Sequence, residues 1–112
     1  MNENSEFISE LTDNDHEEFI EGNEQVVLDL WATWCNPCVQ MNPLIENLAE
    51  KYDGEVKFAK VNIENNGEIP SKYGVQSLPS FLFFKDGELI AKERGKLNEE
   101  EFEEKLQENF DI

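Results

Sequence analysis

The chain has 112 residues and a formal net charge of −17, because 26 acidic side chains outnumber nine basic ones. This length predicts one domain, residues 1–112, with a single hydrophobic core, and the acidity disfavours a nucleic-acid partner because the surface repels phosphate. No apolar stretch approaches the roughly 18 residues of a membrane span, and the first residues lack a signal-peptide pattern. We therefore expect a cytoplasmic protein without membrane contact, with residues 1–5 as a flexible tail.

Strands and helices are expected to alternate from the start of the chain. Residues 6–11 predict a short edge strand, and the N-cap residues 12–15 precede a short helix that ends at Gly22 and Asn23. Residues 26–31 are an almost unbroken apolar run, which predicts a strand covered on both faces.

A longer helix follows that strand. Apolar residues recur at three- and four-residue steps over residues 37–52, where Pro43 is expected to kink the helix. Residues 56–63 predict a strand parallel to the previous one, reached by a right-handed crossover. Residues 65–73 predict a short, weak helix that ends at Gly74.

The last third of the chain predicts a hairpin and a terminal helix. The Asp-Gly pair at 86–87 separates two apolar runs, residues 81–85 and 89–94. Asn98 and Glu101 form the pattern of a capping box. The whole order, β-α-β-α-β-α-β-β-α, predicts an α/β fold with a central mixed sheet of about five strands, flanked on both faces by about four helices.

The two cysteines of the chain, Cys35 and Cys38, stand two residues apart where the long helix begins. A C-x-x-C after a strand in a β-α-β pattern indicates a dithiol redox site, and this spacing favours a reducing compartment. The helix N-terminus favours a thiolate on Cys35, so we expect Cys35 to attack a substrate disulfide. Cys38, one turn further in, is then expected to resolve the mixed disulfide.

The competing interpretation of this pair is half of a zinc or iron–sulfur site. A closed zinc site needs four ligands, and only His16 could join the two cysteines within one chain. We therefore expect no metal and no cofactor other than a redox-active disulfide, although two chains sharing a metal stays open. His16 lies in an acidic stretch, which predicts a histidine on the surface.

Several blocks of sequence, in order and at matching spacing, resemble the thioredoxin family from about residue 6 to residue 110. They are residues 27–38, 58–62, 72–75, 78–80 and 83–87, together with Gly95. The resemblance implies the thioredoxin fold and a monomeric protein-disulfide reductase. Its partners would be proteins that contain disulfides and a thioredoxin reductase, linked to NADPH or ferredoxin.

Asp29 interrupts an apolar strand, and a buried carboxylate is costly unless it is paired or protonated. The family resemblance implies that Asp29 lies beneath Cys38 and assists proton transfer from that thiol, through water. The alternative is a structural acid paired with Lys60, which also projects from an apolar face. The two interpretations are compatible.

The resemblance also implies a docking surface around the dithiol. The Leu78-Pro79 bond would be cis and would face the cysteines, so that the backbone of Leu78 is free to pair with an extended substrate segment. The surface would consist of Trp34, Ile63, Ser77, Leu78, Pro79 and Gly95. Trp31, inside the strand, is expected in the core.

Two departures from the family pattern concern the site. The linker is Asn36-Pro37 where the commonest family linker is Gly-Pro, so Asn36 and Pro37 are expected to tune the redox potential. Val39 replaces a lysine that many relatives carry, and Arg94 and Lys96 could restore positive potential and contact acidic substrates. These departures leave two alternatives open: a dedicated redox partner of one reductase or enzyme, and a non-catalytic binding module that uses the dithiol face.

Overall fold

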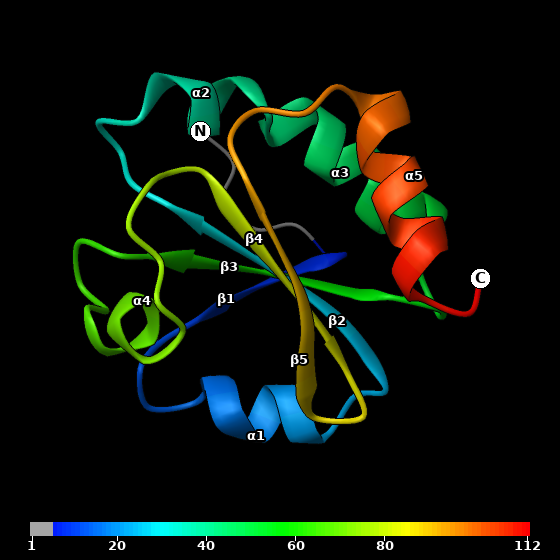
Figure 1. Cartoon of the computed structure of the whole chain (residues 1–112), viewed down its shortest axis with the longest axis horizontal. Helices are drawn as coiled ribbons and strands as arrows, with labels where there is room; N and C mark the ends of the chain where they lie inside the picture. The colour runs from blue at the N-terminus through cyan, green and yellow to red at the C-terminus, as the bar shows by residue number, and fades with distance from the viewer. Residues whose placement is uncertain (1–5) are drawn as a thin grey trace.

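The computed structural model describes residues 6–112, so the tail predicted for residues 1–5 lies outside the described residues. Helices cover both faces of one sheet (Figure 1). The predicted α/β class and thioredoxin fold are confirmed, and so is the element order, except that one predicted helix is divided in two. The elements are β1 (Ile8–Leu11), α1 (His16–Glu21), β2 (Gln25–Trp31), α2 (Asn36–Gln40), α3 (Asn42–Lys51), β3 (Lys57–Asn62), α4 (Glu68–Lys72), β4 (Ser80–Lys85), β5 (Glu88–Arg94) and α5 (Glu99–Asn109).

The sheet has the order β1-β3-β2-β4-β5. β3 runs parallel to both β1 and β2, while β4 runs antiparallel to β2 and β5. The predicted parallel pairing of the second and third strands is therefore confirmed. β2 occupies the centre, and all of its residues before Trp31 are buried, as its apolar run predicts.

The core consists of two layers, one on each face of the sheet. One layer packs the sheet against α3 and α5, and Phe102 of α5 is at its centre, with ring centroids 4.9–6.4 Å from three phenylalanines of the sheet, Phe58, Phe81 and Phe83. The other layer packs the sheet against Ile20 of α1 and Ile69 of α4. Alternate side chains of β2 supply both layers, because successive residues of a strand point to opposite faces.

The helix predicted over residues 37–52 is divided into α2 and α3, which is why there are five helices within residues 6–112 instead of about four. Met41 lies between the two helices. Pro43 has no N–H to continue the hydrogen-bond ladder, and its ring clashes with the carbonyl of the residue four positions earlier. The kink expected at Pro43 is thus a break in the helix.

The surface position predicted for His16 is wrong. Its side chain is buried, with 4% of its area exposed, and its Nδ1 atom lies 3.1 Å from the carbonyl oxygen of Asp13. The ring also makes an edge contact with Tyr73. The acidic neighbours of His16 are misleading because His16 and the buried Ile20 are four residues apart, which places them on the same helix face.

Two local predictions near the C-terminus are confirmed. Asp86 and Gly87 both have positive φ, as a tight hairpin turn between β4 and β5 requires. Asn98 and Glu101 form the capping box of α5, in which each side chain accepts a hydrogen bond from the other residue's backbone N–H.

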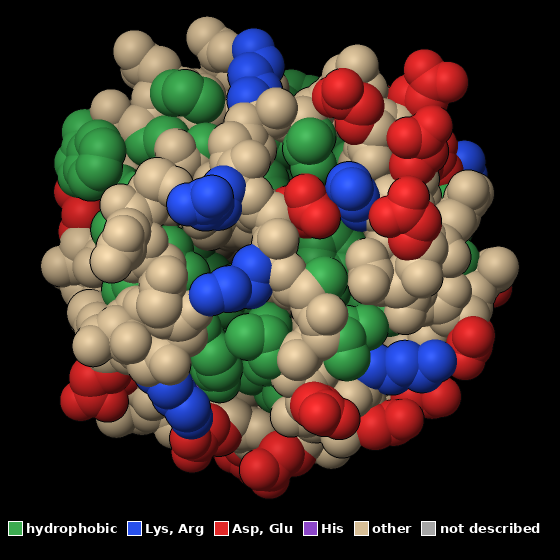
Figure 2. All heavy atoms as spheres, in the orientation of Figure 1, with side chains coloured by type: hydrophobic (Ala, Val, Ile, Leu, Met, Phe, Trp, Pro, Cys, Tyr) green, Lys and Arg blue, Asp and Glu red, His purple; other side chains and the backbone are tan. Residues whose placement is uncertain are grey.

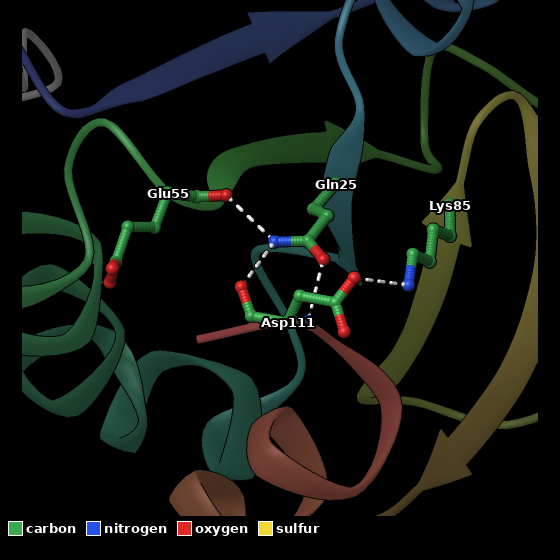
Figure 3. Close-up of polar contacts among 4 residues, drawn as sticks. All are labelled: Gln25, Glu55, Lys85 and Asp111. Carbon is green, nitrogen blue, oxygen red and sulfur yellow. Dashed lines mark hydrogen bonds and ion pairs between the residues drawn. The ribbon is translucent and has the colours of Figure 1, made fainter.

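The first residue of β2 fastens the C-terminal segment to the sheet (Figure 3). Nε2 of the buried Gln25 donates to the carbonyl oxygens of Glu55 at 2.9 Å and Asp111 at 3.4 Å, and Oε1 accepts from the backbone N–H of Asp111 at 2.7 Å. Lys85 forms an ion pair with the carboxylate of Asp111 at 2.8 Å.

No helix within residues 6–112 is both long and apolar enough to cross a membrane.

Candidate redox site

Cys35 and Cys38 form a disulfide at the beginning of α2, close to where β2 ends. Their Cα atoms are 5.3 Å apart, a usual separation for a disulfide. Cys35 is the N-cap residue, and its Sγ atom accepts a hydrogen bond from the backbone N–H of Cys38 at 3.2 Å. Because the first N–H groups of a helix lack partners within it, the same arrangement stabilises a thiolate on Cys35 once the disulfide is reduced.

The disulfide is buried beneath a rim of exposed apolar side chains. Cys35 is 5% exposed and Cys38 is 3% exposed. Trp34, by contrast, is 66% exposed, and Val39 is also exposed. Exposed apolar side chains therefore flank the disulfide along the chain, Trp34 directly before Cys35 and Val39 directly after Cys38. Asn36 and Pro37, the predicted tuning residues, are exposed in the first turn of α2.

The predicted docking residues lie on loops next to the disulfide. Ile63 and Leu78 are half-buried and pack against the two cysteines together with Ala32 and Trp31. The predicted cis bond between Leu78 and Pro79 is confirmed. The carbonyl oxygen of Pro79 accepts a hydrogen bond from the N–H of Gly95 at 2.8 Å, which joins the Gly95 loop to the Leu78-Pro79 loop.

The exposed Ser77 completes this loop by accepting, through its carbonyl oxygen, a hydrogen bond from the Ser80 hydroxyl at 2.7 Å. The structure thus packs Ile63 and Leu78 against the cluster of Ala32 and the two cysteines and connects Gly95 to Pro79. Ser77 and Trp34 extend the surface outward.

Glu64 holds the loop that precedes Cys35, a contact that the sequence did not predict. Its carboxylate accepts hydrogen bonds from the backbone N–H of Thr33 at 2.9 Å and from the Thr33 hydroxyl at 3.0 Å. These bonds lower the pKa of Glu64, the backbone bond having the larger effect. We call this contact the Thr33–Glu64 clasp. Glu64 and Thr33 are 31 residues apart, so no local pattern indicates the contact.

Asp29 is buried in the middle of β2, on the face that α3 and α5 cover. Its Oδ1 atom has no hydrogen-bond partner among residues 6–112. Burial raises the pKa of Asp29 from 3.8 to about 7, opposed by the positive charge of Lys60 and assisted by the negative charge of Glu10. The three residues form one row, because Lys60 is in register with Asp29 on one side and with Glu10 on the other.

The ammonium group of Lys60 donates a hydrogen bond to Oδ1 of Asn42, at the beginning of α3, and lies 5.2 Å from the ring centroid of Trp31. Among residues 6–112, no ion pair joins Lys60 to Asp29. Lys60 therefore acts on Asp29 through its charge, across the strand pair, while Asn42 fixes the position of the ammonium group. Asn42 and Glu10 are further residues of the site that sequence patterns did not indicate.

Residues that could hold a metal ion are not grouped at this site. Within residues 6–112 no cluster of three or more histidine, cysteine, aspartate or glutamate side chains has a suitable arrangement. His16, the one additional ligand that the sequence offered, is buried between α1 and Tyr73 of the α4 end.

Comparisons with known proteins agree with this geometry. The family model described as thioredoxin matches residues 7–108. A thioredoxin of Chlorobaculum thiosulfatiphilum is 35% identical over 90% of this chain and 94% of its own length, and one of Pseudomonas aeruginosa is 38% identical over 84% and 88%.

A structural relative gives the same result at the level of the fold. It is a chain from a study of the thiol resolving mechanism in yeast mitochondrial 1-Cys peroxiredoxin via glutathione/thioredoxin systems. That chain superposes with a TM-score of 0.83 at 31% sequence identity, over 90% of this chain and 94% of its own. The chain described here belongs to the thioredoxin family of thiol–disulfide oxidoreductases.

Proposed function

We propose that the chain is a general reductase of protein disulfides that works in a reducing, cytoplasmic compartment and is recharged by a thioredoxin reductase. The observation that carries this proposal is the position of the dithiol: Cys35 caps α2 beneath an apolar rim that includes Trp34. Such a rim and the free backbone of the Leu78 loop suit many extended partner segments, since neither requires one particular side chain.

The reaction is an exchange of thiols and disulfides in two steps. The Cys35 thiolate attacks one sulfur of the substrate disulfide, forming a mixed disulfide and releasing the first substrate thiolate. The Cys38 thiolate then attacks Sγ of Cys35, which releases the second substrate thiolate and closes the Cys35–Cys38 disulfide. Two electrons pass to the substrate, and two protons pass to its thiols.

Asp29 would accept the proton that Cys38 loses in the second step. A general base is most effective when its pKa is near the working pH, and the pKa of Asp29, about 7, meets that condition. Lys60 would keep that value from rising further. In this proposal Asp29 acts on Cys38, and Lys60 and Asn42 position the charge that acts on Asp29.

The experiment that tests the proposal is a trap made with Cys38→Ser, which stops the reaction at the mixed disulfide. We expect many captured proteins, all released by a reductant, and none captured by the matched control Cys35→Ser. A single captured partner would instead favour a dedicated redox protein. If no protein is captured while the double variant Cys35→Ser/Cys38→Ser keeps its biological activity, the chain is a binding module.

A further inference from the structure

A cavity of about 340 Å³ adjoins the rim of the redox site. It is lined by Gly74, Val75, Ser80, Leu82, Lys92 and Arg94. Ser80 directly follows Pro79, and Arg94 directly precedes Gly95, whose N–H is bonded to Pro79. The cavity therefore begins where the docking surface ends, and we call it the β5 groove.

The β5 groove combines an apolar floor with two cations. In the pairing of β4 with β5, Lys92 is opposite Leu82 and Arg94 is opposite Ser80, so both basic side chains stand on the same face as the floor. Lys92 donates a hydrogen bond to the carbonyl oxygen of Tyr73 at 3.0 Å, which holds its ammonium group at the groove.

The positive charge here is not neutralised, although the chain is strongly acidic. Within residues 6–112, ion pairs with carboxylates are made by Lys51, Lys72, Lys85 and Lys105, and not by Lys92, Arg94 or Lys96. Lys96 donates to Oε1 of Gln40. Glu93, the acid between them, lies near Lys105 instead, at 3.7 Å.

The space-filling view agrees with this distribution of charge. In Figure 2, the Lys and Arg side chains left of the centre of the face have no acidic side chain directly beside them, whereas those at the right and lower margins lie among acidic side chains. Lys92, Arg94 and Lys96 thus have no carboxylate partner within residues 6–112, and the hydrogen bonds of Lys92 and Lys96 go to neutral oxygen atoms, so their positive charge remains available to an acidic ligand.

We propose that the β5 groove binds an aspartate or glutamate side chain of the substrate, so that the chain prefers disulfides in locally acidic segments. This inference rests on the proposed reductase function and specifies its substrates. The planar guanidinium of Arg94 can bind a carboxylate through two parallel hydrogen bonds, and Val75 and Leu82 would contact the methylene groups.

The net charge of −17 does not prevent this preference. At physiological ionic strength the Debye length is about 8 Å, so most of the acidic surface is screened from a carboxylate in the groove. The adjacent cations then decide the local interaction. Since such a pair is partly exposed, we expect a preference of about three- to ten-fold.

The test uses pairs of disulfide-linked peptides that differ only by glutamate or glutamine, with that residue placed in turn at each of three positions on both sides of the cysteine. The pre-reduced chain is mixed with each peptide at 0.15 M salt, and the second-order rate constant for the release of peptide thiols is measured. We expect the best glutamate peptide to react about three- to ten-fold faster than its glutamine partner.

Arg94→Gln should reduce this ratio to near one, because the rate for the glutamate peptide falls much more than the rate for the glutamine peptide. The matched control is Lys57→Gln, which makes the same change of net charge at an exposed residue, the first of β3 and outside the groove. This variant should keep the preference.

Equal rates for both peptides at every position, or an equal loss of preference in Lys57→Gln, would overturn the groove proposal while leaving the reductase intact. If the pre-reduced chain reduces none of the peptides, the proposed function itself is wrong.

Discussion

The two halves of β2 differ in whether their buried polar atoms have hydrogen-bond partners. At its first residue, Gln25 has both polar atoms of its amide bonded, to the backbone of Glu55 and Asp111. Further along, neither Oδ1 of Asp29 nor Nε1 of Trp31 has a partner among residues 6–112. The first residue of β2 is bonded to the C-terminal segment, and the last, Trp31, packs against the two cysteines.

This difference indicates that one end of β2 contributes mainly to stability and the other mainly to the chemistry of the site. A buried polar group that keeps its hydrogen bonds adds to stability, whereas one left unpaired costs about 1–3 kcal/mol. Natural proteins retain few such groups, and a buried carboxyl group with a strongly perturbed pKa is a candidate for function. We therefore interpret Gln25 as an anchor of the fold, whereas Asp29 is the residue on which the proposed proton transfer depends.

The largest effect is expected from Asp29→Asn. Because the pKa of Asp29 is 3.8 before folding and about 7 after it, the folded chain holds a proton that the unfolded chain releases between these pH values. The wild type consequently loses stability as the pH rises through this window, by about 4 kcal/mol in total. The free energy of unfolding of Asp29→Asn minus that of the wild type should therefore increase by about 4 kcal/mol from pH 4 to pH 8. Urea unfolding of the oxidised proteins measures both values.

The cost of burying an amide is the same at both pH values, so it cancels from this comparison. A gap that stays constant with pH would show that Asp29 is already ionised in the folded chain. The rate of disulfide reduction should also lose its inflection near the pKa of Asp29, about 7. An unchanged pH–rate profile would exclude the proton-transfer role.

Gln25→Leu should destabilise the fold by about 2–3 kcal/mol, since up to three hydrogen bonds of about 1 kcal/mol each are lost. The second-order rate constant for disulfide reduction should stay the same, because the anchor is at the far end of β2. Thermal or urea unfolding gives the first quantity, and a single-turnover assay gives the second. A slower reaction in the folded variant would show that Gln25 also affects the redox site, which would contradict the division of roles along β2.

A smaller effect is expected from Glu10→Gln. The negative charge of Glu10 raises the pKa of Asp29 from two strands away, so removing that charge should move the inflection of the pH–rate profile to lower pH. The control is Glu21→Gln, which makes the same charge change at the end of α1 on the other face of the sheet. If both variants shift the profile equally, the row of Glu10, Lys60 and Asp29 has no special influence.

The smallest effect is expected from Lys85→Gln, which breaks the ion pair with Asp111. The carboxylate of Asp111 is largely exposed, and exposed ion pairs contribute about 0–1 kcal/mol. Lys85→Gln should therefore destabilise the chain much less than Gln25→Leu, although both residues contact Asp111. If Lys85→Gln lost as much free energy of unfolding as Gln25→Leu, the ion pair would be what holds the C-terminal segment, and not the buried amide of Gln25.

Sequence patterns predicted those features that depend on neighbours along the chain. The Asp86-Gly87 turn, the capping box at Asn98 and the position of Cys35 at a helix start all follow from residues within a few positions of one another. Asp29 was found because a carboxylate in an apolar run is conspicuous.

The remaining features depend on contacts that only the folded sheet creates. Asp13 illustrates this: its carboxylate accepts the backbone N–H groups of Glu68 and Ile69 and so caps α4 from 55 and 56 residues away. The bond from Lys60 to Asn42 and the influence of Glu10 likewise require the strand order and the packing of α3. The burial of His16 could have been inferred from its spacing to Ile20, but its acidic neighbours obscured that signal.

The Thr33–Glu64 clasp has a consequence for the exchange of partners. None of its hydrogen bonds involves a sulfur atom, so opening the disulfide breaks no part of it. We therefore expect Trp34, which follows Thr33 directly, to keep its position when the disulfide is reduced. A reductase and a substrate would then bind the same surface around Trp34 and distinguish the two redox forms only at Cys35 and Cys38. Hydrogen exchange at the Thr33 amide should be equally slow in both forms.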